Sequence, residues 1–130
     1  MSNSISITTV KESKVDTLDF DTIALGRTFT DHMFVCDYED GQWKNPRITP
    51  MGTIPMHPAC MALHYGQALF EGMKATLSAT GTPLLFRPEK NAERLNFSAR
   101  RLGMPEFSET LFVDALKQLV HLDQKWIPPH

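Results

Sequence analysis

The run Ala62–Lys74 carries residue types that could form one wall of a small-molecule site. It holds two aromatic residues, Tyr65 and Phe70, and two glycines, Gly66 and Gly72. Glycine lets a ligand approach the backbone closely, and aromatic rings supply rigid apolar area, to which tyrosine adds a hydroxyl group. These features favour a small-molecule pocket. The same spacing fits a turn that buries both rings in the core, so both interpretations stay open.

Other residues whose side chains could take part in catalysis or metal binding fit structural roles better. His64 could serve as a general base near neutral pH, but no acid or nucleophile is placed to orient it, which favours a structural histidine. Glu71 and Lys74 are close enough in sequence to form a local ion pair of small energetic value. The spacing of three further potential ligands does not fit a zinc site: His32, His57 and Cys60.

Composition narrows the class of protein. The chain has 130 residues and a net charge of −2, which suits one small domain and gives no electrostatic case for nucleic acid or an anionic membrane. No apolar run is long enough to span a bilayer, and the polar N-terminus is not a secretory signal. We therefore expect a cytoplasmic protein in which Cys36 and Cys60 are free thiols, with residues 1–24 as a flexible tail before a domain at 25–130.

Strand patterns dominate the first half of the chain. Residues 28–38 alternate loosely and predict a strand, and Asp40-Gly41 predicts a tight turn into a second strand at 42–44, which makes a hairpin. Prolines then interrupt an extended segment that includes residues 47–49. Because proline lacks a backbone donor, we expect this segment at a sheet edge or in a loop. A further hairpin is expected from 73–78 and 83–86.

Two helices are expected to close the chain. Pro88 suits a first helical turn, Gly103 suits the end of that helix, and Ser108 suits the N-cap of the next. The first helix has an apolar face formed by Ala92, Leu95, Ala99 and Leu102, and the second by Leu111, Phe112, Ala115, Leu116, Leu119 and Val120. We expect an α+β unit in which both helices cover one face of a largely antiparallel sheet.

Five short motifs occur in order along the chain and resemble those of the N-terminal half of the branched-chain aminotransferases. These are pyridoxal-phosphate enzymes of fold type IV, the D-amino acid aminotransferase-like fold. The motifs are Phe29–Met33, His57-Pro58 with Ala62–Tyr65, Leu69–Lys74, Phe86–Ala99 and Leu122–Pro128. The resemblance runs from about Leu25 to the C-terminus, and the last motif is typical of the branch that includes the animal enzymes.

The resemblance implies roles for four residues. Arg94, in an Asn-x-x-Arg-Leu pattern, would bind the phosphate of pyridoxal 5′-phosphate, a role that suits the planar donors of a guanidinium group. Tyr65 and Phe70 would line the pocket for a branched side chain, and the backbone of Gly72 would lie against substrate or cofactor. Without the resemblance, Arg94 fits a solvated helix arginine and the other three fit core packing at a turn.

Two positions differ from the patterns of some relatives. Lys74 stands where some relatives carry an arginine that is proposed to meet a substrate carboxylate, so that role does not transfer. Leu25 lies near a place where animal-type members carry a pocket phenylalanine, which leaves the shape of the substrate pocket open.

The resemblance also implies that the family's catalytic lysine lies outside this chain. The family's Schiff-base lysine belongs to a second domain, so we expect no catalytic residue in this chain, which would be the N-terminal domain of a longer enzyme and inactive alone. That enzyme would move the amino group of leucine, isoleucine or valine to 2-oxoglutarate, working as a homodimer or larger assembly on small amino and 2-oxo acids. The alternatives are a non-catalytic binding domain of the same fold, or another fold type IV enzyme.

Overall fold

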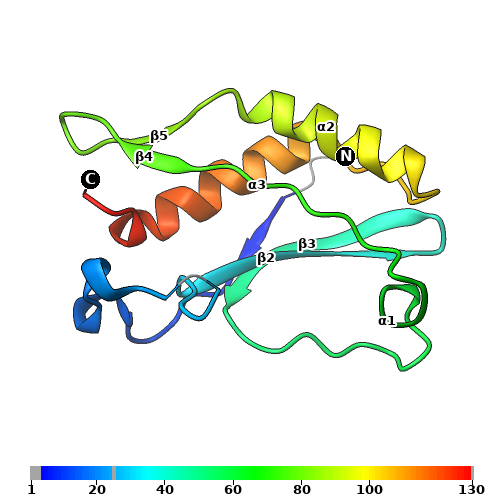
Figure 1. Ribbon diagram of the computed structural model, residues 1–130, viewed down its shortest axis with the longest axis horizontal. Coiled ribbons are helices and arrows are strands. Elements are labelled where there is room, and N and C mark those ends of the chain that lie inside the picture. Colours follow the sequence, from blue (N-terminus) through cyan, green and yellow to red (C-terminus); the bar gives the residue numbers. More distant parts are fainter. Residues whose placement is uncertain (1–3, 25, 130) are drawn as a thin grey trace.

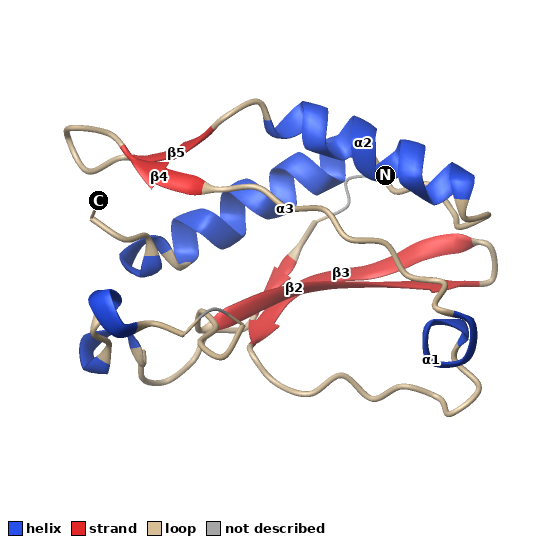
Figure 2. Ribbon diagram, in the orientation of Figure 1, coloured by secondary structure: helices blue, strands red, loops and turns tan. Residues whose placement is uncertain are grey.

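The computed structural model describes residues 4–24 and 26–129, which form a small mixed α/β unit. Two long helices, α2 (Pro88–Arg101) and α3 (Glu109–Leu122), lie side by side above a three-stranded sheet (Figure 1). A separate two-stranded hairpin lies beside α3, and long loops connect these parts (Figure 2). The helices therefore cover one face of the larger sheet, as expected.

The first hairpin joins β2 (His32–Glu39) and β3 (Gln42–Pro50) as antiparallel neighbours. The two turn residues, Asp40 and Gly41, have φ angles of 52° and 78°. Positive φ at both positions is the geometry of the two-residue turns whose twist matches that of the flanking strands. The predicted hairpin is confirmed, although β2 begins at His32 rather than at residue 28.

The N-terminal segment differs from the flexible tail that we expected. Its strand β1 (Ser6–Ile7) pairs in parallel with residues 47 and 48 of β3, and the Thr8 N–H donates to the Ile48 carbonyl at 2.9 Å. Two short 3-10 helices, η1 (Val15–Thr17) and η2 (Phe20–Thr22), follow. A strand of two residues gives no periodic signal in the sequence, because only the distant partner strand defines it.

The expectation that residues 47–49 lie at a sheet edge or in a loop is wrong. The strand order is β1-β3-β2, so β3 is central, and Ile48 of β3 is fully buried. Pro46 is tolerated because it lies within a register shift, between the partners of Val35 and Asp37, where the regular pairing of the two strands is interrupted. A bulge of this kind is one of the few places where a strand accepts proline.

The second hairpin is confirmed as β4 (Ala75–Leu77) and β5 (Pro83–Leu85). It does not join the first sheet. The pairing is largely antiparallel, as expected, but the short parallel strand β1 makes the larger sheet mixed and the second hairpin is separate from it. In chain order, the short helix α1 (Met61–Tyr65) comes between β3 and β4. It ends at Gly66, whose φ of 62° allows the chain to change direction.

Local sequence signals set the bounds of α2 and α3. Pro88 is the first residue of α2, and the Ser108 hydroxyl accepts the Leu111 N–H at 3.3 Å at the start of α3. After α2, Gly103 adopts a φ of 64° and its N–H reaches the Arg100 carbonyl at 3.2 Å. The Met104 N–H reaches the Ala99 carbonyl at 2.9 Å, which completes a Schellman motif.

The core lies between the helices and beneath them. Its buried apolar residues are Val15, Ile48, Ala92, Ala99, Leu111 and Ala115. On its flank, Trp43 of β3 packs edge to face against Phe107, with ring centroids 4.8 Å apart. Leu102, which we expected on the buried face of α2, is 42% exposed because it lies at the C-cap where the chain leaves the helix.

Candidate functional site

Glu71 is the centre of a polar cluster that joins two of the sequence motifs. Its side chain is 6% exposed, and it forms a salt bridge with Arg94 of α2, whose side chain is 64% exposed. Arg94 Nε donates to Glu71 Oε2 at 2.8 Å, and Arg94 Nη2 donates to Oε1. One edge of the guanidinium group is therefore bound to a buried carboxylate, whereas the rest of the group faces outward.

Asn91 adds a second link between the same segments. Its Nδ2 donates to Glu71 Oε1 at 2.8 Å and to the Gly72 carbonyl at 3.1 Å. Asn91 and Arg94 are three residues apart on α2 and so lie on the same face of the helix. The segment 70–72 is thereby fixed to α2 through both a side chain and the backbone.

The electrostatics of this cluster favour an ionised Glu71. Hydrogen bonding from Arg94 lowers the pKa of Glu71 from 4.5 to about 2, against the opposing effect of burial, and Asn91 adds to the lowering. Glu71 therefore stays negative across the physiological pH range, and Arg94 keeps its partner.

The expected local ion pair between Glu71 and Lys74 is wrong. Glu71 pairs with Arg94, which is 23 residues away in sequence, and Lys74 is exposed. Lys74 is the nearest cation along the chain, but the Glu71 carboxylate accepts hydrogen bonds from Asn91 and Arg94 of α2 instead. The sequence carried one signal for this pairing, since Glu71 and Arg94 both belong to motifs of the same resemblance.

The two aromatic residues are not core residues. Tyr65 is 80% exposed and Phe70 is 90% exposed, which excludes the interpretation of a turn that buries both rings. Phe70 directly precedes Glu71 and so lies next to the polar cluster, whereas Tyr65 lies at the end of α1. Within residues 4–24 and 26–129, no hydrogen bond links the Tyr65 hydroxyl to the cluster.

Gly72 lies against the Phe70 ring. A Cβ atom at Gly72 would meet two ring carbons of Phe70 at 3.2 and 3.3 Å, which is tighter than ordinary van der Waals contact. A side chain at this position would therefore displace the ring by a few tenths of an ångström. The structure thus brings Arg94, Gly72 and Phe70 to one corner of the molecule, with Glu71 between them.

His64 has a structural contact, in agreement with the sequence. Its Nε2 lies 2.6 Å from the Pro58 carbonyl, which ties α1 to the preceding loop. Both cysteines, Cys36 and Cys60, are free thiols, as expected. Among the residues that the structure describes, no cluster of three or more His, Cys, Asp or Glu side chains could hold a metal ion. Leu25, which differs from the animal-type pattern, lies outside the described residues.

A buried polar cluster at the other end of the sheet was missed by the sequence. His32, at the start of β2, and Asp123, after α3, form a pair whose side chains are each 5% exposed. Asp123 accepts from His32 Nδ1 at 2.6 Å and from the His32 backbone N–H at 3.0 Å. On the other side of the ring, Nε2 accepts the Val10 N–H at 3.0 Å, so the imidazole is neutral with its proton on Nδ1.

Asp31 extends this cluster to the last motif. Its carboxylate accepts the Ser13 hydroxyl at 2.5 Å and the Trp126 indole N–H at 2.9 Å. These hydrogen bonds, with one from the Lys14 N–H, lower the pKa of Asp31 although burial opposes ionisation. The Leu122–Pro128 motif thus contributes Asp123 and Trp126 to a structural junction, which a pattern alone could not reveal because the partners are over 90 residues apart.

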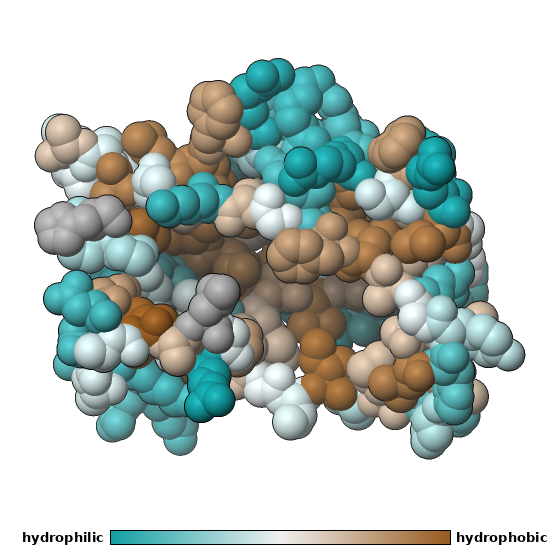
Figure 3. Space-filling view, viewed as in Figure 1, coloured by the Kyte–Doolittle hydropathy of each residue, from teal (hydrophilic) through white to brown (hydrophobic). Residues whose placement is uncertain are grey.

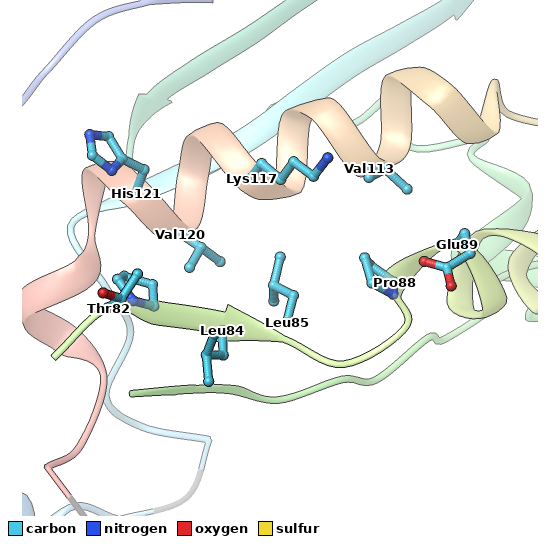
Figure 4. A pocket seen from close by; sticks show the side chains of 10 residues that line it. Thr82, Leu84, Leu85, Pro88, Glu89, Val113, Lys117, Val120 and His121 are labelled. Atoms are coloured by element: carbon cyan, nitrogen blue, oxygen red, sulfur yellow. The ribbon is translucent and has the colours of Figure 1, made fainter. Parts of the chain in front are cut away.

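Apolar surface gathers around a hollow between the helical layer and the sheet (Figure 3). A second hollow lies between α3 and strand β5, where Leu85 faces Val113 and Val120, with Lys117 and Glu89 nearby (Figure 4). None of the four residues to which the resemblance assigns a role lines this second hollow. It is therefore separate from the corner that holds Glu71 and Arg94.

No helix among the described parts of the chain is long and apolar enough to cross a membrane. No protein-family model matches the chain. Curated proteins do match it at high identity, and their names agree with each other.

Branched-chain-amino-acid aminotransferase 2 of Bacillus subtilis (strain 168) is 49% identical over 125 residues, which cover 95% of this chain and 34% of that protein. A probable branched-chain-amino-acid aminotransferase of Staphylococcus aureus (strain MRSA252) is 40% identical over 129 residues, 98% of this chain and 36% of that protein. The mitochondrial branched-chain-amino-acid aminotransferase of Bos taurus is 43% identical over 107 residues, 82% of this chain and 27% of that protein. The chain, which spans about a third of the length of the curated relatives it matches, belongs to the branched-chain aminotransferase family.

Proposed function

We propose that the chain is the small N-terminal domain of a fold type IV branched-chain aminotransferase. The full-length protein moves the amino group of leucine, isoleucine or valine to 2-oxoglutarate and produces a branched 2-oxo acid and glutamate. Three relatives with this name, at 40 to 49% identity over most of the chain, support the proposal. The parent enzyme is a cytoplasmic homodimer or larger assembly whose partners are small amino and 2-oxo acids.

The observation that carries the proposal is the junction of two motifs at Glu71. The junction gathers three different features: Arg94 can donate hydrogen bonds to an anion, Gly72 offers accessible backbone, and Phe70 offers an exposed ring. A pocket for an amino acid and an anionic cofactor needs these three features close together. An arginine in a solvated ion pair alone would require neither the buried carboxylate nor the link to Gly72.

The chemistry of Arg94 fits pyridoxal 5′-phosphate. Nε and Nη2 face Glu71, and among the described residues Nη1 has no hydrogen-bond partner, so the outer edge of the fork can donate to phosphate oxygens. Arginine binds phosphate with paired, parallel N–H donors. Pyridoxal 5′-phosphate, when bound, supplies the electron sink that amino-group transfer requires. This domain contributes Arg94 to the phosphate and no proton-transfer group.

Tyr65, Phe70 and Gly72 serve the substrate. The exposed rings of Tyr65 and Phe70 offer apolar area to a branched aliphatic side chain, which gains free energy by leaving water. The absence of a side chain at Gly72 leaves its backbone open to the substrate or cofactor and leaves Phe70 undisturbed.

The test is an amino-donor profile of the purified full-length protein. The protein is mixed with pyridoxal 5′-phosphate and 2-oxoglutarate, and glutamate is measured with leucine, isoleucine, valine, L-alanine or D-alanine as donor. We expect the three branched donors to exceed L-alanine and D-alanine by at least about tenfold, because a pocket lined by aromatic rings favours larger apolar side chains. Turnover led by D-alanine would indicate another fold type IV enzyme, and no turnover would indicate a binding domain.

A further inference from the structure

Glu71 is more deeply buried than Arg94, its partner in the salt bridge. The carboxylate is 6% exposed and the Arg94 side chain is 64% exposed. Four donors reach it: Nε and Nη2 of Arg94, Nδ2 of Asn91 at 2.8 Å and the Gly72 N–H at 3.1 Å. Glu71 is thus held by several donors, whereas the exposed Arg94 side chain depends on Glu71 for its orientation.

The two contacts from Arg94 constrain its orientation. A long arginine side chain has several rotamers, and ordering it costs conformational entropy. Because Nε and Nη2 form one rigid edge of the planar group, their simultaneous bonds to both oxygens of Glu71 fix the direction of the opposite edge. A ligand that meets this opposite edge finds it already ordered.

Asn91 fixes the carboxylate in turn. Its Nδ2 bonds both Glu71 and the Gly72 carbonyl, so the loop around residue 71 cannot shift along α2 without breaking one of the bonds. Asn91 therefore supports the acid, and the acid supports the arginine.

We infer that Glu71 is a positioning residue, which holds the guanidinium group of Arg94 so that its outer edge receives the cofactor phosphate. This inference rests on the proposed function, because it requires Arg94 to bind that phosphate. Glu71 itself touches neither substrate nor cofactor and acts through Arg94.

Positioning and simple electrostatics predict opposite results when the charge of Glu71 is removed. A negative group beside the arginine weakens its attraction for a phosphate, so loss of that charge alone should tighten phosphate binding. Loss of the ordered orientation should weaken binding instead. The variant Glu71→Gln separates these effects, since it keeps the size of the side chain and removes the charge.

The experiment measures dissociation constants of pyridoxal 5′-phosphate and of pyridoxal, which lacks the phosphate, for the cofactor-free full-length protein. Arg94→Gln, Glu71→Gln, their double variant and Asn91→Ala are compared with the wild type. Glu93→Gln is the matched control, because Glu93 lies beside Arg94 on α2 but pairs with Lys90 at 2.6 Å. Thermal unfolding of each variant reports whether it is folded.

We expect Glu71→Gln to weaken pyridoxal 5′-phosphate binding by about tenfold, the factor that one lost charge-assisted hydrogen bond carries. Pyridoxal binding should change less than about twofold, and the double variant should bind no more weakly than Arg94→Gln alone. Asn91→Ala should act in the same direction with a smaller effect, and it tests the inference if Glu71→Gln does not fold. Glu93→Gln should leave both constants unchanged.

Two results separate the inference from the proposed function. If Arg94→Gln leaves the ratio of the two dissociation constants unchanged, Arg94 does not bind the phosphate, and the assigned role of Arg94 falls. If Arg94→Gln lowers the preference for the phosphate form but Glu71→Gln leaves or raises it, only the positioning role of Glu71 is overturned. Equal weakening of both ligands by Glu71→Gln also overturns it, because that pattern indicates a general loss of structure.

Discussion

At Glu71 a buried carboxylate binds one edge of the Arg94 guanidinium group and leaves the rest of that group exposed. Arg94 was recognised from its motif, and the exposed guanidinium edge is compatible with the role that the motif implies. The partner of Arg94 was not predicted, because an ion pair across 23 residues depends on how a loop folds back onto α2. Exposure also could not be predicted: aromatic residues are usually buried, yet Tyr65 and Phe70 are not.

The ionisation of Glu71 leads to a prediction for acid stability. Its pKa is about 2 in the folded chain, below its ordinary value of 4.5. A carboxylate with a lowered folded pKa contributes stability that is fully present above the unfolded pKa and is lost as the pH falls through the folded value. We therefore expect the difference in melting temperature between wild type and Glu71→Gln to be constant above about pH 5.5 and to shrink toward pH 2.

Circular dichroism melts at a series of pH values measure this difference. The control is Glu93→Gln, since Glu93 is 48% exposed in its side chain and its loss should change the melting temperature little at any pH. A difference between wild type and Glu71→Gln that stays the same from pH 6 to pH 2 would contradict the account.

At the scale of elements, local signals were reliable and distant ones were not. The hairpin at Asp40-Gly41, the start of α2 at Pro88 and the N-cap at Ser108 were predicted because each depends on a few adjacent residues. Strand β1 and the central position of β3 were not predicted, because they depend on pairing between segments about 40 residues apart. Pro46 favoured a sheet edge or a loop for this segment, because the bulge that accommodates the proline depends on the partner strand.

The junction of β2 with the end of α3 yields a prediction for stability. Asp123 accepts both the backbone N–H and the Nδ1–H of buried His32, so its removal leaves two donors unsatisfied. We expect Asp123→Ala to lower the free energy of unfolding by about 3 kcal/mol, the scale of leaving two buried donors unsatisfied. Urea unfolding provides the measurement. Asp114→Ala, on the exposed side of α3, should change it by less than about 0.5 kcal/mol, and equal effects would refute the assignment.

The end of α2 yields a second prediction. Gly103 has a φ of 64° and open space where a Cβ would lie, so an alanine there meets no neighbour but adopts a strained backbone. We expect Gly103→Ala to cost about 1 kcal/mol of stability. Gly52 also has room for a Cβ, without the positive φ, so Gly52→Ala should be near neutral. If Gly103→Ala left the free energy of unfolding in urea unchanged, the positive φ at the end of α2 would not limit stability.

At the scale of the whole molecule, the N-terminal segment is joined to the far end of the chain through His32. Val10 bonds one ring nitrogen of His32, and Asp123 bonds the other. The polar composition of Met1–Ser13 favours a tail. In the described part of this segment, however, Thr8 and Val10 donate to the Ile48 carbonyl and to the His32 ring, which lie in β3 and β2. A segment held mainly by distant backbone and imidazole contacts has no compositional signature.

Amide hydrogen exchange tests this connection. The Thr8 and Val10 N–H groups donate to the Ile48 carbonyl and to His32 at 2.9 and 3.0 Å. We expect both amides to exchange at least about tenfold more slowly than the Lys11 amide. In Asp123→Ala, the exchange rate of the Val10 amide should rise more than that of the Thr8 amide. Exchange of Val10 at the rate of Lys11 in the wild type would show that the segment is not held.

Binding of the cofactor phosphate by Arg94 can be followed by phosphorus NMR of the full-length protein with bound pyridoxal 5′-phosphate. A free phosphate monoester takes up its proton near a pKa of roughly 6. Held by Arg94, it should stay dianionic, so the resonance should not move between about pH 5.5 and 8, whereas in Arg94→Gln it should titrate in that range. A resonance that titrates in the wild type, or that behaves identically in Arg94→Gln, would show that Arg94 does not bind the phosphate.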